Sequence, residues 1–329
     1  MPVNYGDLAA SVAKKRLNKK KPSDNITTEN GLFHFINESK NFKIGDFSGN
    51  GVTELFAHGV LDDTGGAGTP KNIGWYNPYE VFNPNTAQDY IDGGTFDFKQ
   101  LGAMITFTGA DQIRWSGKEK AVELVSSRLD VADKNLQNKF AAGLFDDGTS
   151  AGGRSMGGLQ LLVQDDPTAA GTVGGIDQVA NPFWQNTAQD NLAVAVSSSN
   201  VVSRMNGAHL SLVRGDDKPD VIICDDEYFR AYEDSQQANG RFTSRKLADA
   251  GFQGYEYKGI PVLFDSNCPA KHMYMLNSKY LHVRYAKGRW FEPEEARKVV
   301  LGDSSVMPIW TAANMTCSNR KQQAVIFNS

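Results

Sequence analysis

The chain has 329 residues and a formal net charge of −4, with 34 Lys and Arg residues against 38 Asp and Glu residues. Such a near-balanced charge excludes a strong overall attraction to a polyanion or to an anionic membrane surface. The length exceeds the roughly 250–300 residues at which single cores stop growing, so two packed units are expected. The 3 cysteines and 5 histidines are scattered, which predicts free thiols and excludes a zinc site.

Residues 1–49 have the pattern of an N-terminal arm. Apolar residues at Leu8, Val12 and Leu17 predict a short helix that ends in a basic cluster. That cluster begins with Lys14, Lys15 and Arg16. Two interpretations stay open: a solvated helix end, where basic residues are common, or a contact with an acidic protein or with DNA.

No part of the sequence has the ~18 consecutive apolar residues that a membrane span needs. Asp7 also interrupts the apolar stretch that a secretory signal would require. The sequence therefore predicts a soluble chain that is made in the cytosol and has no membrane partner.

Residues 50–95 alternate between extended segments and a glycine-rich stretch. The segments GVTELFAHGVL at 51–61 and NIGWYNPYEVF at 72–82 flank the loop DDTGGAGTPK. Two arms of this length predict a β-hairpin roughly 36 Å long. Because a lone hairpin is marginal in water, we expect it to lean on another molecule. An ordinary surface hairpin folded back on its own domain is the alternative.

Several aromatic side chains lie on segments that lack an evident core. They are Trp75, Tyr76, Tyr79, Phe82, Phe183 and Trp184. For any single aromatic residue, a position in the core is the better expectation. As a set, however, they are predicted to be anchors of a protein interface.

A strand and a long helix follow the hairpin. Apolar residues alternate with other residues from Leu101 to Phe107, which predicts a strand with one apolar face. Ser116 and Glu119 have the spacing of a capping box, and apolar residues then recur every three or four positions as far as Leu144. About 28 residues make a helix of roughly 42 Å, long enough to act as a spine.

The stretch DDPTAAGTVGGIDQVANPFWQN at 165–186 carries small residues and glycines in its first half. We interpret it as a flexible joint between two units, whose bending stops at the sequence N-P-F-W. Beyond it, strands are predicted at 220–224, 260–264 and 272–276, with helices near 200–213 and 226–238, which indicates an α/β unit.

Two further predictions concern a pair of aspartates and the C-terminal tail. Asp225 and Asp226 follow the first of these strands and are expected to cap a helix rather than act as catalytic acids. The apolar tail at 306–327 is expected to return to the strand at 96–108 beside the long helix.

Motifs that could carry catalysis lack the context they need. The sequence G-R-S-M-G at 153–157 has the spacing of a nucleophile elbow around Ser155, but a helix rather than a strand precedes it. Asp63 begins a D-T-G triplet that lies in the loop of the predicted hairpin. No glycine-rich segment has the spacing of a nucleotide site, and no metal motif is present. The sequence therefore predicts neither an enzyme nor a cofactor, and a serine hydrolase that uses Ser155 is kept as an unlikely alternative.

The order of these parts resembles a known family. The segments at 94–149, 157–186 and 259–285, and within them G-G-L-Q, G-G-I-D and N-P-F-W, are similar to the major capsid protein of tailed bacteriophages typified by phage Hong Kong 97. The resemblance implies an α+β chain with the Hong Kong 97-type capsid fold. Its parts would be an N-terminal arm (1–49), an extended β-hairpin loop (50–95), a peripheral domain with the spine helix (96–186, with return strands at 301–329) and an α/β axial domain (187–300).

The resemblance also implies a function. The chain would be a structural subunit that self-assembles into the hexamers and pentamers of an icosahedral shell around double-stranded DNA. It would be assembled in the host cytoplasm and located in the virion, with scaffolding, portal and decoration proteins as further partners and no scaffold fused ahead of the arm. Another structural protein of a phage virion is the alternative.

Some members of that family crosslink their shells by an isopeptide bond between a lysine and an asparagine. Lys71 is the only lysine between residues 44 and 98, so it is the candidate for such a bond here. No acidic catalyst for the reaction can be assigned from the sequence, and the crosslink stays open.

Overall fold

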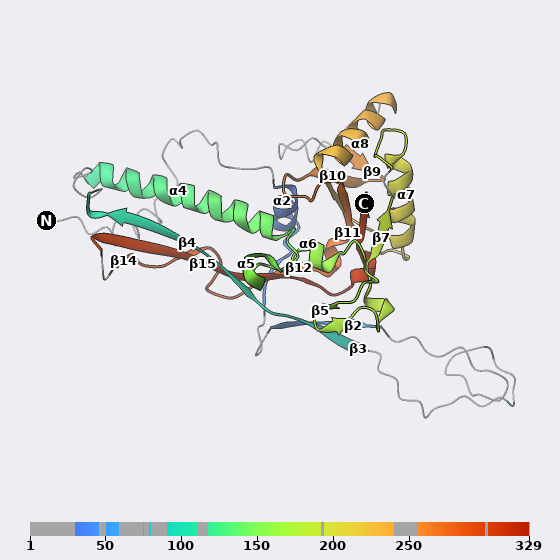
Figure 1. The fold of residues 1–329 in the computed structure, drawn as a ribbon, viewed down its shortest axis with the longest axis horizontal. Helices are drawn as coiled ribbons and strands as arrows, with labels where there is room; N and C mark the ends of the chain where they lie inside the picture. Colours follow the sequence, from blue (N-terminus) through green and yellow to red (C-terminus); the bar gives the residue numbers. More distant parts are fainter. Residues whose placement is uncertain are drawn as a thin grey trace.

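The computed structural model describes residues 30–45, 51–58, 75, 79, 91–110, 118–191, 194–239, 255–299 and 302–328. Together these residues form an elongated molecule (Figure 1). At one end a long helix runs beside two long strands, and at the other end two helices flank a second sheet. The apolar patterns of the sequence account for most of this arrangement.

The sheet beside the long helix, here called the long sheet, is built around β15 (Ser304–Cys317). One side of β15 pairs along β4 (Lys99–Thr108), with Met307 opposite Ile105. Its other side pairs with β12 (Leu281–Tyr285), β13 (Glu292–Pro293) and β14 (Arg297–Lys298), and β1 (Phe42–Ile44) joins β12. The predicted return of the tail to the strand after residue 96 is therefore confirmed for β15.

The long helix is α4 (Lys118–Gly143), with 26 residues, so the predicted spine is confirmed. Its buried stripe includes Val125, Leu129 and Leu136, each at most 3% exposed. These residues pack on Ile105 and Phe107 of β4, whose alternation places its apolar residues on one face. Ser116, the predicted cap, lies outside the described residues.

The second sheet, here called the compact sheet, has six strands. In spatial order they are β7 (Thr187–Asp190), β16 (Ala324–Phe327), β11 (His272–Leu276), β8 (Val221–Cys224), β10 (Ile260–Phe264) and β9 (Tyr255–Tyr257). The predicted strands at 220–224, 260–264 and 272–276 are thus confirmed.

Helices cover both faces of the compact sheet, which explains why every residue of the strand β8 is buried. α7 (Val201–Leu212) and α8 (Asp226–Asn239) pack on one face. The other face meets α2 (Gly31–Glu38) and the end of the spine helix. Asp225 accepts a hydrogen bond of 3.0 Å from the backbone N–H of Tyr228, so its predicted capping role is confirmed.

Sheet membership changes two of the expected boundaries. Strands β12, β13 and β14 lie between residues 281 and 298, inside the predicted axial domain, yet they belong to the long sheet. β16 lies within residues 301–329, which were predicted to be return strands of the peripheral domain, yet it belongs to the compact sheet. The cause is a short helical turn, η3 (Arg320–Gln322), after which the fully apolar strand A-V-I-F can be buried between β7 and β11.

A two-stranded ribbon stands where the hairpin was expected, but its pairing differs. β2 (Val52–Ala57) pairs antiparallel with β3 (Ile91–Phe96), and Val52 lies opposite Phe96. The described part of the first arm therefore pairs with 91–96, and the predicted partner at 72–82 lies outside the described residues except for Trp75 and Tyr79. The sequence I-D-G-G-T-F has no regular apolar alternation that would predict a strand. Its Gly94 packs against the ring of Trp184, where an added methyl group would lie 3.2 Å from the indole.

Among the described residues, no helix is long and apolar enough to cross a membrane.

Replacing Gly158 with alanine tests the close packing of its backbone against the backbone of Gly143 and Leu144 at the end of the spine helix. A methyl group there would collide with the backbone carbonyl oxygens of Leu144 and Gly143. We expect the free energy of unfolding of Gly158→Ala to fall by about 2 kcal/mol in a urea titration, because backbone must move to make room. Gly171→Ala is the control, since its methyl group would lie 3.6 Å from Gln178, and its change should stay within ~1 kcal/mol. Equal stability of the two variants would contradict this explanation.

Candidate functional site

The connection between the two sheets, residues 157–186 and here called the linking segment, contributes several buried side chains to the core, although residues 168–172 are exposed. It contains α6 (Leu159–Leu162), β5 (Thr172–Val173), β6 (Ile176–Asp177) and the turn η1 (Pro182–Trp184). Leu159, Leu162, Val173 and Trp184 are each at most 1% exposed. The two glycines between β5 and β6 both have positive φ, so they form the tight turn of a small hairpin.

Arg320 anchors the linking segment from a distant part of the chain. Its side chain is fully buried, and its Nε donates a hydrogen bond of 2.7 Å to the carbonyl oxygen of Leu162. One terminal nitrogen donates to the carbonyl oxygen of Trp184 at 3.1 Å and to Gln178 Oε1 at 3.2 Å, and the other donates to Asn186 Oδ1 at 3.2 Å. Burial lowers the pKa of Arg320 to about 10, so the group still carries its charge at neutral pH.

Side-chain amides complete this network. Asn186 Oδ1 accepts from the backbone N–H of Gln164 at 3.0 Å, and Asn186 Nδ2 donates to the carbonyl oxygen of Gln164 at 2.8 Å. Gln178 Nε2 donates to Gln164 Oε1 at 2.7 Å and to the carbonyl oxygen of Ala169 at 2.8 Å. Buried hydrogen bonds thus hold the stretch at Gln164, Gln178 and Asn186, whereas residues 165, 166 and 168–172 are exposed. The interpretation as a flexible joint stays a prediction.

Trp184 belongs to the core of its own subunit. It is 1% exposed, its Nε1 donates to the carbonyl oxygen of Val173 at 2.9 Å, and its ring stacks on Phe56 of β2 with centroids 4.4 Å apart. Its predicted role as an interface anchor is wrong, since both the ring face and the N–H are already used. Phe183 is only half-buried and stacks on His58, with centroids 4.3 Å apart.

The other candidate interface residues divide into two groups. Trp75 and Tyr79 are 100% and 98% exposed in the single chain, so no contact within the subunit occupies them. The remaining candidates lie outside the described residues: Lys14, Lys15, Arg16, Lys71, Tyr76 and Phe82.

The base of the ribbon has a buried face, which carries Val52, Phe96 and the single carboxylate Glu54, and an exposed face with two large apolar side chains. On the buried face, Glu54 Oε1 lies 2.7 Å from Arg284 Nη2 and accepts from the hydroxyl of Thr316 at 2.9 Å. On the opposite face, Leu55 is 70% exposed and Ile91 is 68% exposed. The ion pair ties the ribbon to β12 and the hydrogen bond of Thr316 ties it to β15, while the two apolar side chains on the opposite face are exposed.

The surroundings of Ser155 do not support the hydrolase alternative. The residue follows α5 (Ser150–Gly153) rather than a strand, and its hydroxyl is buried without a hydrogen-bond partner in the described part of the chain. His272 is bonded to Asp165 and to the carbonyl oxygen of Ala270 instead. Nothing described here would deprotonate this serine. Nor do the described residues contain a group of three or more His, Cys, Asp or Glu that could hold a metal ion.

Comparison with known proteins gives matches among solved structures only; no family model and no curated protein sequence matches the chain. A subunit of the cyanophage A-1(L) capsid superposes with a TM-score of 0.70 at 17% identity, over 94% of this chain and 96% of that one. The capsid of a native GTA particle matches with a TM-score of 0.57 at 14% identity, over 98% of both chains.

The chain has the Hong Kong 97-type capsid fold. The fold implied by the resemblance is thus confirmed. The same fold extends to an encapsulin complex from Synechococcus elongatus, which matches with a TM-score of 0.55 at 9% identity over 96% of this chain and 94% of that one.

Arg320→Met tests whether one guanidinium fixes the linking segment. The variant keeps the length of the side chain but removes one donor from four buried oxygens, of which only Asn186 Oδ1 keeps another donor named above, so we expect the free energy of unfolding to fall by about 3 kcal/mol. Lys321→Met is the matched control, because Lys321 is the exposed neighbour and its loss should cost less than ~0.5 kcal/mol. Denaturant titration measures both changes, and similar values for the two variants would refute the anchoring role.

Proposed function

We propose that the chain is the major capsid protein of a tailed double-stranded DNA bacteriophage and forms the shell of its head. The observation that carries the proposal is the superposition on the cyanophage A-1(L) capsid subunit over 94% of this chain and 96% of that one. The capsid of the GTA particle gives the same correspondence.

The surface of the molecule supports this role. Shell subunits bind copies of themselves through many small contacts, which requires exposed apolar side chains on segments that reach beyond the core. The ribbon provides them at Leu55 and Ile91, and the segment beyond it provides Trp75 and Tyr79. In this proposal these residues, together with Phe183, contact neighbouring subunits in hexamers and pentamers.

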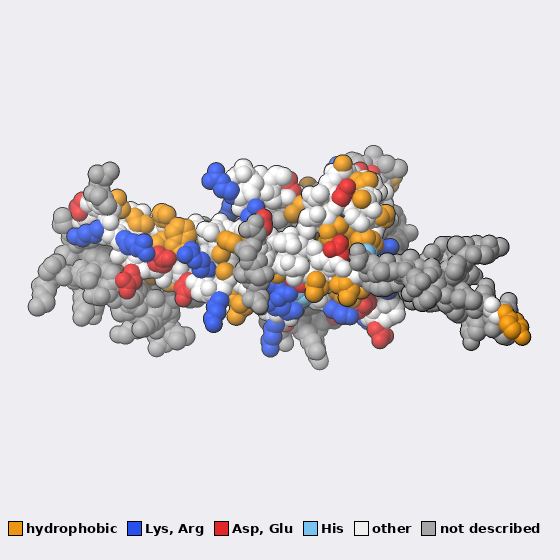
Figure 2. Space-filling model, turned by 90° about the horizontal axis from the view of Figure 1, so that it is seen from below, with side chains coloured by type: hydrophobic (Ala, Val, Ile, Leu, Met, Phe, Trp, Pro, Cys, Tyr) orange, Lys and Arg blue, Asp and Glu red, His pale blue; other side chains and the backbone are white. Residues whose placement is uncertain are grey.

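The charge of the molecule suits a container for DNA. Figure 2 shows Lys and Arg side chains interspersed with Asp and Glu side chains and apolar areas on one face of the molecule. A lining of mixed charge avoids the counterion release that would bind packaged DNA tightly. The basic cluster at Lys14, Lys15 and Arg16 would contact an acidic neighbour or scaffold.

We assign the parts of the chain by the same proposal. Residues 1–49 are the arm and 50–95 the extended loop. The peripheral part comprises the spine helix and the long sheet, and the axial part comprises the compact sheet with α7 and α8. Assembly in the host cytoplasm, scaffolding, portal and decoration partners, and a crosslink through Lys71 belong to the proposal as well.

A shell of the encapsulin kind is the second candidate, since an encapsulin complex shares the fold. Its TM-score of 0.55 is lower than the 0.70 of the cyanophage capsid subunit, and we therefore favour the phage capsid. A different structural protein of the virion would have to use a shell fold without forming a shell.

Electron microscopy of the expressed protein tests both the shell and the ribbon contact. We expect the wild-type chain to form capsomers and closed shells, and the double variant Leu55→Lys, Ile91→Lys to remain unassembled because two desolvated charges oppose the contact. Its unfolding midpoint should stay near that of the wild type, since both residues are exposed.

The control is Leu55→Met, which preserves the apolar surface and should assemble normally. A wild-type chain that forms neither capsomers nor shells would refute the proposed function. Normal shells from the double variant would refute only the ribbon contact.

A further inference from the structure

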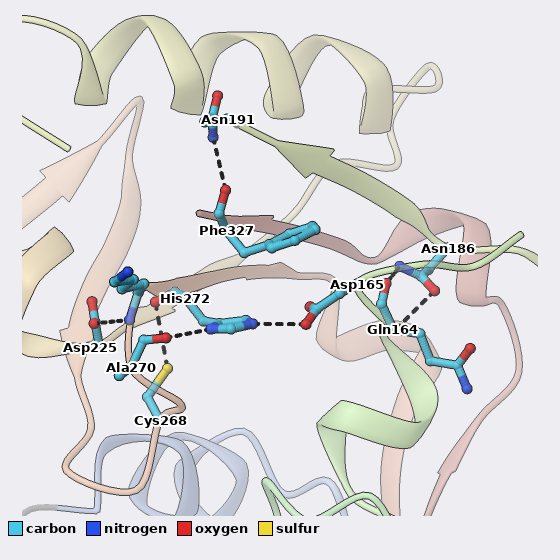
Figure 3. A network of polar contacts seen from close by, with 10 residues as sticks. Gln164, Asp165, Asn186, Asn191, Asp225, Cys268, Ala270, His272 and Phe327 are labelled. Atoms are coloured by element: carbon cyan, nitrogen blue, oxygen red, sulfur yellow. Dashed lines mark hydrogen bonds and ion pairs between the residues drawn. The ribbon is translucent and has the colours of Figure 1, made fainter. Parts of the chain in front are cut away.

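His272 lies at the start of β11 and connects the compact sheet to the linking segment (Figure 3). Its Nδ1 is 2.7 Å from the carbonyl oxygen of Ala270, and its Nε2 is 3.0 Å from Asp165 Oδ2. The imidazole is also stacked on Phe327, with ring centroids 5.7 Å apart and an interplanar angle of 15°. The ring is thus held in one orientation, with each nitrogen directed at an oxygen.

The two oxygens decide the protonation state that fits this geometry. A backbone carbonyl oxygen can only accept a hydrogen bond, and an ionised carboxylate can only accept as well. Both ring nitrogens must therefore carry a proton to satisfy both contacts, and only the imidazolium does so. A neutral imidazole would place a nitrogen lone pair against one of the two oxygens.

The groups around His272 favour the charged ring. Asp165 contacts it from the linking segment, and Asp225 contributes a negative charge from the end of β8. The nearby thiol of Cys268 and the hydroxyl of Tyr274 stay neutral, because burial raises the pKa of each well above its ordinary value. Lys271, the neighbour in sequence, is exposed and uses its backbone N–H to bond Asp225.

These groups determine whether the pKa of His272 is raised or lowered in the folded chain. Burial lowers the pKa of His272, but the hydrogen bonds from Asp165 and Ala270 and the charges of Asp165 and Asp225 outweigh it, so the pKa is raised from 6.5. A histidine whose pKa is higher in the folded chain contributes stability that is complete below about pH 6.5. That contribution is lost as the pH rises through the pKa of the folded state.

We propose that His272 and Asp165 form a proton-dependent latch that holds the linking segment on the compact sheet. With the imidazolium present, the latch is closed across two segments that are 107 residues apart in sequence. Loss of one proton removes one charge-assisted hydrogen bond and leaves residues near Asp165 held only by the Arg320 network. The latch is a property of the folded chain and does not depend on the proposed shell function.

A second histidine makes global stability an unsuitable readout. His282 Nε2 lies 3.3 Å from the ammonium of Lys43, which can only donate, so that nitrogen must be unprotonated. Burial, followed by the charges of Lys43 and Arg284, lowers the pKa of His282 to about 4. A depressed histidine pKa costs stability as the pH falls below about 6.5, whereas the stability from His272 is lost as the pH rises above that value. A global unfolding curve contains both changes and therefore does not isolate His272.

Hydrogen exchange of peptides that cover residues 160–170 tests the latch locally. The full chain would be compared at pH 5.5 and pH 8.5, with exchange times corrected for the intrinsic rate. We expect protection in the wild type to fall about tenfold at the higher pH, because one charge-assisted hydrogen bond is lost. Asp165→Asn and His272→Gln should show the lower protection at both pH values.

Asp166→Asn is the matched control. Asp166 is the adjacent carboxylate, its Oδ1 accepts from Thr168 and not from His272, and the variant should behave as the wild type. Protection that does not change with pH in the wild type would overturn the latch. So would a pH dependence that persists in Asp165→Asn. A titration of the His272 ring by ¹⁵N NMR gives an independent check, because the latch requires both nitrogens to be protonated at pH 6.

Discussion

The structure depends on one buried cation without a carboxylate partner among its identified contacts. Arg320 is fully buried, and its donors are satisfied by two backbone carbonyl oxygens and two side-chain amides. A guanidinium in such a place is tolerated only if the surrounding oxygens are held in position, because an unsatisfied buried charge costs several kcal/mol, on the order of 3–5. The need to satisfy Arg320 therefore determines how the linking segment is arranged.

This constraint reaches every part of the molecule. Arg320 stands between the last residue of β15 in the long sheet and the first residue of β16 in the compact sheet. Through the carbonyl oxygen of Trp184 it positions the indole ring, and that ring supports Phe56 and Gly94 at the base of the ribbon. The two sheets, the linking segment and the ribbon thus meet around a single side chain. The Glu54–Arg284 ion pair fastens the same face of the ribbon to β12.

Local patterns were enough to predict the regular elements. The stripe that includes Val125 and Leu129 indicated the spine helix, and the alternation from Leu101 to Phe107 indicated β4, since burial on one face leaves a period in the sequence. Elements fixed by distant partners leave no such period. β3 is a strand because it pairs with β2, and the linking segment is held by a residue more than 130 positions away. The glycines at 174 and 175 suggested mobility, whereas their positive φ angles serve a tight turn.

A reconstruction of assembled particles by electron cryomicroscopy would test the central claim, that the linking segment is a rigid connection fixed by Arg320. Subunits at positions that symmetry does not relate have different neighbours in one shell. A comparison of their conformations shows which parts of the chain change with those neighbours. The account predicts that every subunit keeps the contacts of Arg320 with the carbonyl oxygens of Leu162 and Trp184, and that differences are confined to other segments. A linking segment that bends differently from subunit to subunit, with Arg320 detached in some of them, would contradict it.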